Sequence, residues 1–529
     1  MNKHKIYINL FVFAALVGFS LSGCGTKPSV VEDVSVVANK SEVVELKDGD
    51  VYDLVASYLD KEIAGKSYRM LAYNGSIPGP ILKVPQGGEV TINFKNNTEI
   101  ATSIHSHGIR LDNKYDGVVD DMQPAVQPGG VFVYKIKFPD AGMYWYHPHV
   151  YESFAQANGL YGNYWVVPNS KDYWAPVNNE VPLIVSDLLI ENGQLDGFRG
   201  NPSSYSLMGK YGNVMLVNGD DNYKKSFKQG EVIRFYITNS SNTRVFNLSI
   251  SGVKMKLVGG DNGKYEREEW SDAIVLAPSE RSIIEVLFDK KGEFDLKSIS
   301  PLKSYALGSF VVTDEKVGES FAKEFNVLRK NSDVIADIDS FRKSFDKNAD
   351  KSISFTLDML GMQGMGGGHM MSSGGMMDHG SMAAEGGMMG GADVDSDEKI
   401  EWEDSMPMMN QMSNSDLVKW KIIDEMTGKE GMDVDWKFKV GDQVKMKIFN
   451  DPDSEHPMHH PFHIHGQRFL VLTTNGVKNT NLVWKDTVLI PKGDTVEILV
   501  DMKNPGLWMA HCHIAEHLES GMMIEFEVK

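Results

Sequence analysis

The sequence predicts an all-β protein built from three related domains. The chain has 529 residues, which is too long for a single hydrophobic core. Three stretches alternate apolar and polar residues after a glycine and end at an asparagine, and they begin at Gly87, Gly230 and Gly441. Alternation with a period of two is typical of a half-buried β-strand that runs into a loop. Its recurrence predicts that the three domains repeat one another.

A second repeat shows how the domains differ. Each domain places a glycine five residues before a key position: Gly142 before His147, Gly292 before Lys297, and Gly506 before His511. Earlier in each domain, a His-x-His pair of the first and third domains corresponds to two serines in the second: His105 and His107, His463 and His465, against Ser249 and Ser251. We therefore expect metal in the first and third domains and none in the second.

Loop composition predicts the domain boundaries. The expected segments are a signal peptide at 1–23, a tether at 24–50, a first domain at 51–168, a second domain at 181–314, a connector at 315–350, and a third domain at 351–529 with a methionine-rich insertion at about 362–412. Within the connector, Phe321, Phe325 and Leu328 are spaced at helical intervals, which predicts an amphipathic helix.

The N-terminal residues have the pattern of an export signal. Two lysines precede an apolar run that is shorter than a membrane-spanning helix and ends before Cys24. Residues 21–24 (LSGC) resemble a bacterial lipoprotein box, in which the cysteine is lipidated, and a plain signal peptide cleaved nearby is the alternative. We expect an exported protein, periplasmic or at the cell surface, that is anchored to a membrane through lipid on Cys24.

The charge balance excludes one class of partner. Lys and Arg number 53 against 72 for Asp and Glu, which gives a net charge of −19. Nucleic-acid binding depends on basic groups that neutralise phosphates, so we expect no nucleic-acid partner. The chain has two cysteines, Cys24 and Cys512, and we expect lipid on one and metal on the other, hence no disulfide. We expect a monomer.

Four His-x-His pairs are the main candidates for metal binding. They are His105 and His107, His147 and His149, His463 and His465, and His511 and His513. Residues i and i+2 of a strand share a face, so each pair presents two imidazoles on one side. Imidazole binds zinc, copper, iron and nickel alike, so the pairs alone do not identify the metal.

Cys512 favours copper over zinc. It lies between two histidines of one strand and must therefore face the opposite side from both. His517 follows five residues later and Met522 ten residues later, and a blue-copper site needs a Cys, two His and a weak axial Met. His460 lies an odd number of residues from His463, so it is expected to point toward Cys512 and to supply the second histidine.

The motifs HSHG, HPH, HPFHIHG and HCHIxxHxxxGM resemble those of the multicopper oxidases, the family of laccases, cuprous oxidases and copper-resistance oxidases. The resemblance covers essentially the whole mature chain outside the methionine-rich insertion. It implies three cupredoxin-like Greek-key β-sandwich domains. It also implies four copper ions per chain, of which three would form a cluster between the first and third domains.

The same resemblance implies a set of copper ligands. The type 1 copper would take His460, Cys512, His517 and Met522. The type 2 copper would take His105 and His463. The type 3 pair would take His107, His147, His149, His465, His511 and His513.

The implied reaction oxidises a substrate one electron at a time and reduces dioxygen to water. Cys512 would conduct electrons to the cluster, and Asp116 matches the family's proton-delivering acid, although a turn aspartate is the alternative. These two are the implied catalytic residues. Many relatives carry a glutamate where this chain has Leu518, so the second proton donor is unassigned, with Glu516 and Glu519 as neighbouring acids.

Methionine indicates the substrate. Nearly half of the 29 methionines fall between Met359 and Met412, among glycines and without helical spacing. Thioethers are soft ligands selective for Cu(I), so we predict Cu(I) oxidation in copper tolerance, with a disordered linker as the alternative interpretation of the insertion. Cuprous oxidases resembling this chain dock copper at the position of Met458, although the aspartate expected two residues earlier is His456. The candidate substrate-copper ligands are Met458, Met359, Met362 and Met365.

Two other functions remain open. A laccase-like oxidase of phenols or other organic donors would use the same ligands, and its insertion would only shield the site. A copper-binding or sequestering protein would instead use the insertion as its active part. A structural scaffold without copper is disfavoured, because no ligand of the set is missing.

Overall fold

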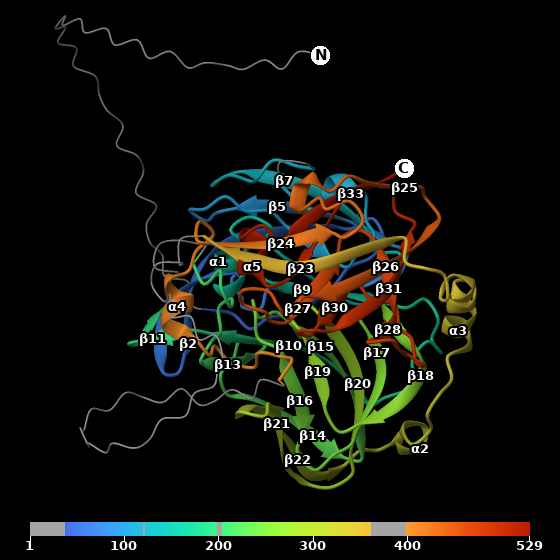
Figure 1. The fold of residues 1–529 in the computed structure, drawn as a ribbon. Coiled ribbons are helices and arrows are strands. Elements are labelled where there is room, and N and C mark those ends of the chain that lie inside the picture. Colours follow the sequence, from blue (N-terminus) through green and yellow to red (C-terminus); the bar gives the residue numbers. More distant parts are fainter. Residues whose placement is uncertain (1–37, 120–121, 198–203, 361–397) are drawn as a thin grey trace, which may run out of the picture. The chain divides into compact units, whose positions relative to one another are not determined.

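The computed structural model describes residues 38–119, 122–197, 204–360 and 398–529, and these form three β-sandwiches in chain order (Figure 1). The predicted all-β class is confirmed. The three alternating stretches become β5 (Glu89–Asn96), β15 (Glu231–Asn239) and β26 (Asp442–Asn450), each an inner strand of its sheet. No helix within these ranges is long and apolar enough to cross a membrane.

The first sandwich packs a four-stranded sheet, in the order β3-β2-β5-β7, against a five-stranded sheet, in the order β1-β4-β9-β8-β6. Leu54 and Phe94 of one sheet and Tyr164 of the other meet in its core. The edge strand β6 pairs with β8, which sets His105 opposite His147. The other elements are β1 (Val43–Glu45), β2 (Val51–Ile63), β3 (Lys66–Tyr73), β4 (Ile81–Pro85), β6 (His105–His107), η1 (Asn113–Tyr115), β7 (Val131–Lys137), β8 (Gly142–His147), α1 (Glu152–Ala157) and β9 (Gly162–Val167).

The second sandwich has sheets in the orders β13-β10-β15-β20-β17-β18 and β14-β22-β21-β16-β19, with a β11-β12 hairpin beside them. Here β16 pairs with β21, and Ser249 lies opposite Lys297 where the first sandwich has two histidines. Its elements are β10 (Asn179–Leu188), β11 (Ile190–Glu191), β12 (Gln194–Leu195), β13 (Val214–Val217), β14 (Tyr223–Gln229), β16 (Phe246–Ile250), β17 (Met255–Gly260), β18 (Gly263–Ser271), β19 (Ile274–Leu276), β20 (Arg281–Phe288), β21 (Gly292–Ile299) and β22 (Ser304–Lys316).

The third sandwich has sheets in the orders β24-β23-β26-β31-β28-β29 and β25-β33-β32-β27-β30. The pairing of β27 with β32 sets His463 opposite His511, which repeats the register of the first sandwich. Its elements are β23 (Lys351–Met359), α4 (Pro407–Met412), β24 (Val418–Asp424), η5 (Gly431–Asp433), β25 (Trp436–Phe438), β27 (His460–Ile464), β28 (Arg468–Thr474), β29 (Val477–Lys478), β30 (Thr487–Ile490), β31 (Thr495–Met502), β32 (Gly506–Cys512), α5 (Ala515–Glu519) and β33 (Met523–Val528).

The connector is helical in pieces rather than along one amphipathic helix. It contains α2 (Ala322–Phe325), α3 (Ser332–Asp339) and η3 (Arg342–Ser344), and Leu328 lies outside all three with 43% of its surface exposed. Phe325 packs on Trp270 of the second sandwich, whereas Ile338 packs among residues of the third. Because its apolar residues have different partners, the connector bends between them.

Apolar clusters also join the sandwiches to one another. Val118 of the first sandwich packs with Met509 and Leu518 of the third. Trp402, which precedes α4, packs with Val245 of the second sandwich. The first of these contacts joins the two sandwiches that carry the His-x-His pairs.

Gly466 allows β27 to approach β32 closely. Its φ of +64° lies in the left-handed region, and a Cβ atom there would lie 2.3 Å from the ring of Trp508. Trp508 is fully buried in the core of the third sandwich, so its ring has no space to move into. The residue after His465 is therefore restricted to glycine.

We expect Gly466→Ala to lower the free energy of unfolding by about 2–4 kcal/mol, because overpacking adds to backbone strain. Gly476→Ala is the matched control, since Gly476 has a φ of +76° with no atom within 4 Å of the added Cβ. Thermal unfolding of both copper-free variants is the measurement. Equal midpoints for the two variants would show that the contact with Trp508 costs nothing.

Candidate metal centre

The structure gathers the paired histidines where the first and third sandwiches meet. Their ring nitrogens form three groups, in each of which the atoms lie within 4.8 Å of one another. The groups are His105, His107 and His463; His107, His147 and His513; and His149, His465 and His511. Every group combines histidines of both sandwiches, so neither sandwich could form this cluster alone.

A separate group lies on the opposite face of β32. Sγ of Cys512 lies 3.5 Å from Nδ1 of His460 and 3.8 Å from Nδ1 of His517, and the two nitrogens are 3.4 Å apart. His460 begins β27, and His517 lies in α5. The strand alternation that directs His511 toward the cluster directs Cys512 away from it.

The surroundings of Cys512 are apolar. Trp420 stacks on His517 with ring centroids 4.2 Å apart, and the side chain of Met522 is fully buried in the same core cluster as Cys512. Burial raises the pKa of the Cys512 thiol, and a bound metal would offset this by stabilising the thiolate. A thiol, two imidazoles and a buried thioether match the donor set of a blue-copper site.

Oxygen acceptors orient most rings of the cluster. In five of them Nδ1 donates to an oxygen 2.7–3.0 Å away: His105, His147, His463, His465 and His511. Five Nε2 atoms of the cluster have no hydrogen-bond partner among the described residues, those of His105, His147, His149, His463 and His513. An imidazole held by one nitrogen leaves the other free to bind metal.

His107 is oriented the other way. Its Nε2 lies 2.9 Å from Oδ1 of Asp486 and 3.0 Å from the hydroxyl of Thr487. Its Nδ1 is the nitrogen that lacks a partner in the described structure. His107 would therefore bind a metal through Nδ1.

Burial favours the neutral form of several cluster histidines. Burial lowers the pKa of His465 and His511 to about 3, and it lowers the pKa of His107 and His513 well below the usual value. Neutral imidazole is the form that binds metal, so no proton needs to leave before loading. Unpartnered, buried nitrogens that face one another fit a group of copper ions.

Asp116 holds two of these rings. Its Oδ2 accepts from Nδ1 of His465 at 2.7 Å, and its backbone oxygen accepts from Nδ1 of His105 at 2.7 Å. Burial alone would raise the pKa of this carboxyl, but the contacts with His465 and His105 hold it below its usual value. Its implied part in proton delivery stays a prediction.

Glu152 is an acid of the site that the sequence analysis missed. Its carboxylate lies 3.6 Å from Nδ1 of His147, 3.8 Å from Nε2 of His149 and 3.8 Å from Nδ1 of His513. Burial raises its pKa well above the usual value. Its position three residues after His149, at the start of α1, was the available signal.

The two acids near Leu518, Glu516 and Glu519, are both hydrogen-bonded, whereas Leu518 packs among apolar side chains. Glu519 accepts hydrogen bonds from the amide and hydroxyl of Ser153, and Glu516 accepts one from Asn242. Leu518 packs in the apolar cluster between the first and third sandwiches. The acid that faces the cluster from this side is therefore Glu152, in the first sandwich.

Comparison with known proteins identifies the family. Three models described as multicopper oxidase match residues 56–171, 162–298 and 401–529. The multicopper oxidase mco of Staphylococcus aureus is 27% identical over 88% of this chain and 85% of its own length. Copper resistance protein A of Escherichia coli is 24% identical over 97% of this chain and 98% of its own. The chain belongs to the multicopper oxidase family.

A solved structure shares the fold. The multicopper oxidase of Campylobacter jejuni, described as a metallo-oxidase, matches 94% of this chain and 98% of its own with a TM-score of 0.67 and 24% identity. Membership of the family makes the protein a copper-dependent oxidoreductase that uses dioxygen as electron acceptor. The histidine groups and the Cys512 group are compatible with the type 1, type 2 and type 3 copper sites of the family.

We expect Asp116→Ala to lower copper content and the rate of dioxygen uptake, because His465 loses the acceptor that fixes its ring. Removal of such a partner typically costs about 10–100-fold in metal affinity or activity. Asp112→Ala is the control, since Asp112 is exposed on the same loop. Copper per chain and oxygen uptake are measured together, and a fully loaded Asp116→Ala variant of normal rate would contradict this role.

Proposed function

We propose that the protein oxidises Cu(I) to Cu(II), with dioxygen reduced to water, as a means of copper tolerance. Four Cu(I) ions give up one electron each, and these electrons with four protons convert one dioxygen to two waters. The observation that carries the choice of substrate is a methionine-bearing surface beside the Cys512 group. Copper resistance among the relatives also supports it.

We propose the following ligand set. Type 1 copper is held by His460, Cys512, His517 and Met522, type 2 copper by His105 and His463, and the type 3 pair by His107, His147, His149, His465, His511 and His513. When bound, copper supplies one-electron chemistry at Cys512 and dioxygen reduction at the histidine cluster. The backbone of Cys512 is bonded to both His511 and His513, so the protein provides a short covalent path between the two sites.

The substrate surface is on α4. Met408 and Met412 are 77% and 59% exposed and stand four residues apart, which places both thioethers on one face of the helix. The helix is attached by Asn410, whose Oδ1 accepts from the amide of Met208 at 3.0 Å. The backbone of Leu207, the residue before Met208, hydrogen-bonds to His517, which lies 3.8 Å from Cys512. Exposed soft ligands therefore lie on an element that packs beside the electron-accepting site.

The other substrate-copper candidates have different surroundings. Met458 has no exposed surface, so copper would reach its thioether only after neighbouring side chains move. Met359 ends β23, half-buried against the same core cluster, and its amide donates to Glu455. Met362 and Met365 lie outside the described residues. We propose these four methionines as further ligands of substrate copper.

The cellular location and domain limits are also proposals. We propose export and lipid anchoring through Cys24, which lies outside the described residues. The proposed domains remain 51–168, 181–314 and 351–529. The described end of the methionine-rich insertion, from 398 to 412, contains α4.

We expect the double variant Met408→Leu/Met412→Leu to raise KM for Cu(I) by about 3–10-fold, as for a loss of about 1 kcal/mol in substrate binding. Oxygen uptake with a phenolic donor should stay unchanged, because that donor needs no thioether. Met426→Leu/Met432→Leu is the matched control, since these methionines are 64% and 49% exposed elsewhere on the third domain. Unchanged uptake with Cu(I), or an equal loss with both donors, would favour a laccase-like oxidase.

We expect Cys512→Ser to lose the blue absorption and all oxygen uptake while about three coppers stay in the histidine cluster. The measurements are the visible spectrum, copper per chain and oxygen uptake. A protein that only sequesters copper would behave differently, because its role would survive the substitution. Unchanged copper tolerance of cells that carry Cys512→Ser would therefore overturn the oxidase proposal.

A further inference from the structure

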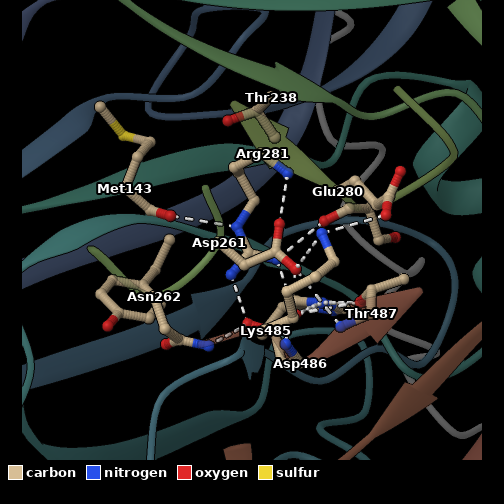
Figure 2. A network of polar contacts seen from close by, with 12 residues as sticks. Met143, Thr238, Asp261, Asn262, Glu280, Arg281, Lys485, Asp486 and Thr487 are labelled. Atoms are coloured by element: carbon tan, nitrogen blue, oxygen red, sulfur yellow. Dashed lines mark hydrogen bonds and ion pairs between the residues drawn. The ribbon is translucent and has the colours of Figure 1, made fainter. Parts of the chain in front are cut away.

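A buried ionic network joins the second sandwich to the third (Figure 2). Arg281, at the start of β20, is fully buried, and its guanidinium donates to both carboxylate oxygens of Asp486. Asn262 of the second sandwich donates to Oδ2 of the same carboxylate at 2.9 Å. Asp486 precedes β30 of the third sandwich and contacts His107 of the first. One carboxylate therefore connects all three sandwiches.

Every side chain that hydrogen-bonds to the carboxylate of Asp486 donates to it. Oδ1 accepts from Nη1 of Arg281 at 2.7 Å, from the hydroxyl of Thr487 at 3.0 Å and from Nε2 of His107 at 2.9 Å. A carboxylate that only accepts obliges Nε2 of His107 to carry the proton. Nδ1 of His107 is then unprotonated and available to a metal.

The position of the carboxylate is itself fixed. The Arg281 guanidinium is held from behind by the backbone oxygens of Met143 at 3.0 Å and Ser279 at 2.8 Å. A Cβ atom on Gly108, the residue after His107, would lie 2.3 Å from Oδ2 of Asp486 and 2.8 Å from Nη2 of Arg281. The ion pair thus packs directly against the backbone that carries His107, and it has no space to turn.

We propose that Arg281 is a positioning residue of the copper cluster. Through Asp486 it holds His107 with Nε2 protonated and Nδ1 directed to copper, although the second sandwich supplies no ligand of its own. This inference rests on the proposed ligand set, in which His107 binds the type 3 pair. It does not depend on which substrate donates the electrons.

Asp486→Asn tests the tautomer directly. An amide has one NH2 group, which faces Nη2 of Arg281 and Asn262 in one orientation of the side chain and Nη1 of Arg281 and His107 in the other. If it faces His107, the ring can accept only by moving its proton to Nδ1. We expect copper affinity at one cluster position to fall about 10–100-fold, while the blue absorption stays.

Arg281→Lys tests whether Arg281, which does not touch His107, positions that ring through Asp486. Lysine keeps the charge but not the paired guanidinium contacts, so the carboxylate is no longer held in one orientation. We expect the same direction of change as for Asp486→Asn, with a smaller loss of copper. Thr487→Val is a milder companion, because it removes the second contact of Nε2 of His107 and leaves the ion pair in place.

Arg234→Lys is the matched control. Arg234 is buried in the second sandwich, and its Nε and Nη2 both donate to one carboxylate oxygen of Glu285, Oε1, which does not contact His107. We expect this variant to lose thermal stability, as Arg281→Lys does, but to keep its full copper content. The control therefore separates the loss of stability caused by replacing any buried arginine from a loss of copper at the cluster.

The readouts are copper per chain after dialysis against a chelator, the EPR-visible fraction of that copper, and the unfolding midpoint of the copper-free protein. A coupled Cu(II) pair is EPR-silent, so a displaced His107 should raise the visible fraction. Full copper with an unchanged visible fraction in Asp486→Asn would overturn the positioning role. A wild type that holds cluster copper but does not turn over Cu(I) would instead overturn only the proposed substrate.

Discussion

The shared burial of histidines from the first and third sandwiches is the constraint on which the rest of the structure depends. Their unpartnered nitrogens face one another without solvent, an arrangement that costs free energy unless a metal occupies it. The apolar contacts between sandwiches and the carboxylates of Asp116 and Asp486 hold the rings in place against that cost. The second sandwich contributes Arg281 and Asn262, which donate hydrogen bonds to Asp486.

Much of this arrangement could be predicted from the sequence, because side chains alternate between the two faces of a strand. That alternation placed His511 and Cys512 on opposite faces, and it directed His460 toward Cys512 from fifty-two residues away. The same reasoning could not find Glu152, Asp486 or Arg281. Asp486 and Arg281 are single charged residues without a repeat, and they contact each other and His107 across three sandwiches. Glu152 also lacks a repeat, and its place three residues after His149 was its only signal in the sequence.

Other differences arise where local pattern and tertiary contact compete. Leu328 has helical spacing from Phe325, yet the chain leaves the helix between them because its apolar residues pack on two different sandwiches. Leu518 occupies a position where an acid was expected, and it packs with Val118 and Met509. An acidic side chain remains close to the cluster, but it comes from α1 of the first sandwich.

The contact between His107 and Asp486 joins residues 379 positions apart in the chain. Contacts of such long range form late, because the entropy of closing the intervening chain must be overcome first. A partly synthesised chain therefore has strands of the first sandwich but no cluster. The chain can therefore retain copper at the cluster only after the first and third sandwiches have both folded and packed together.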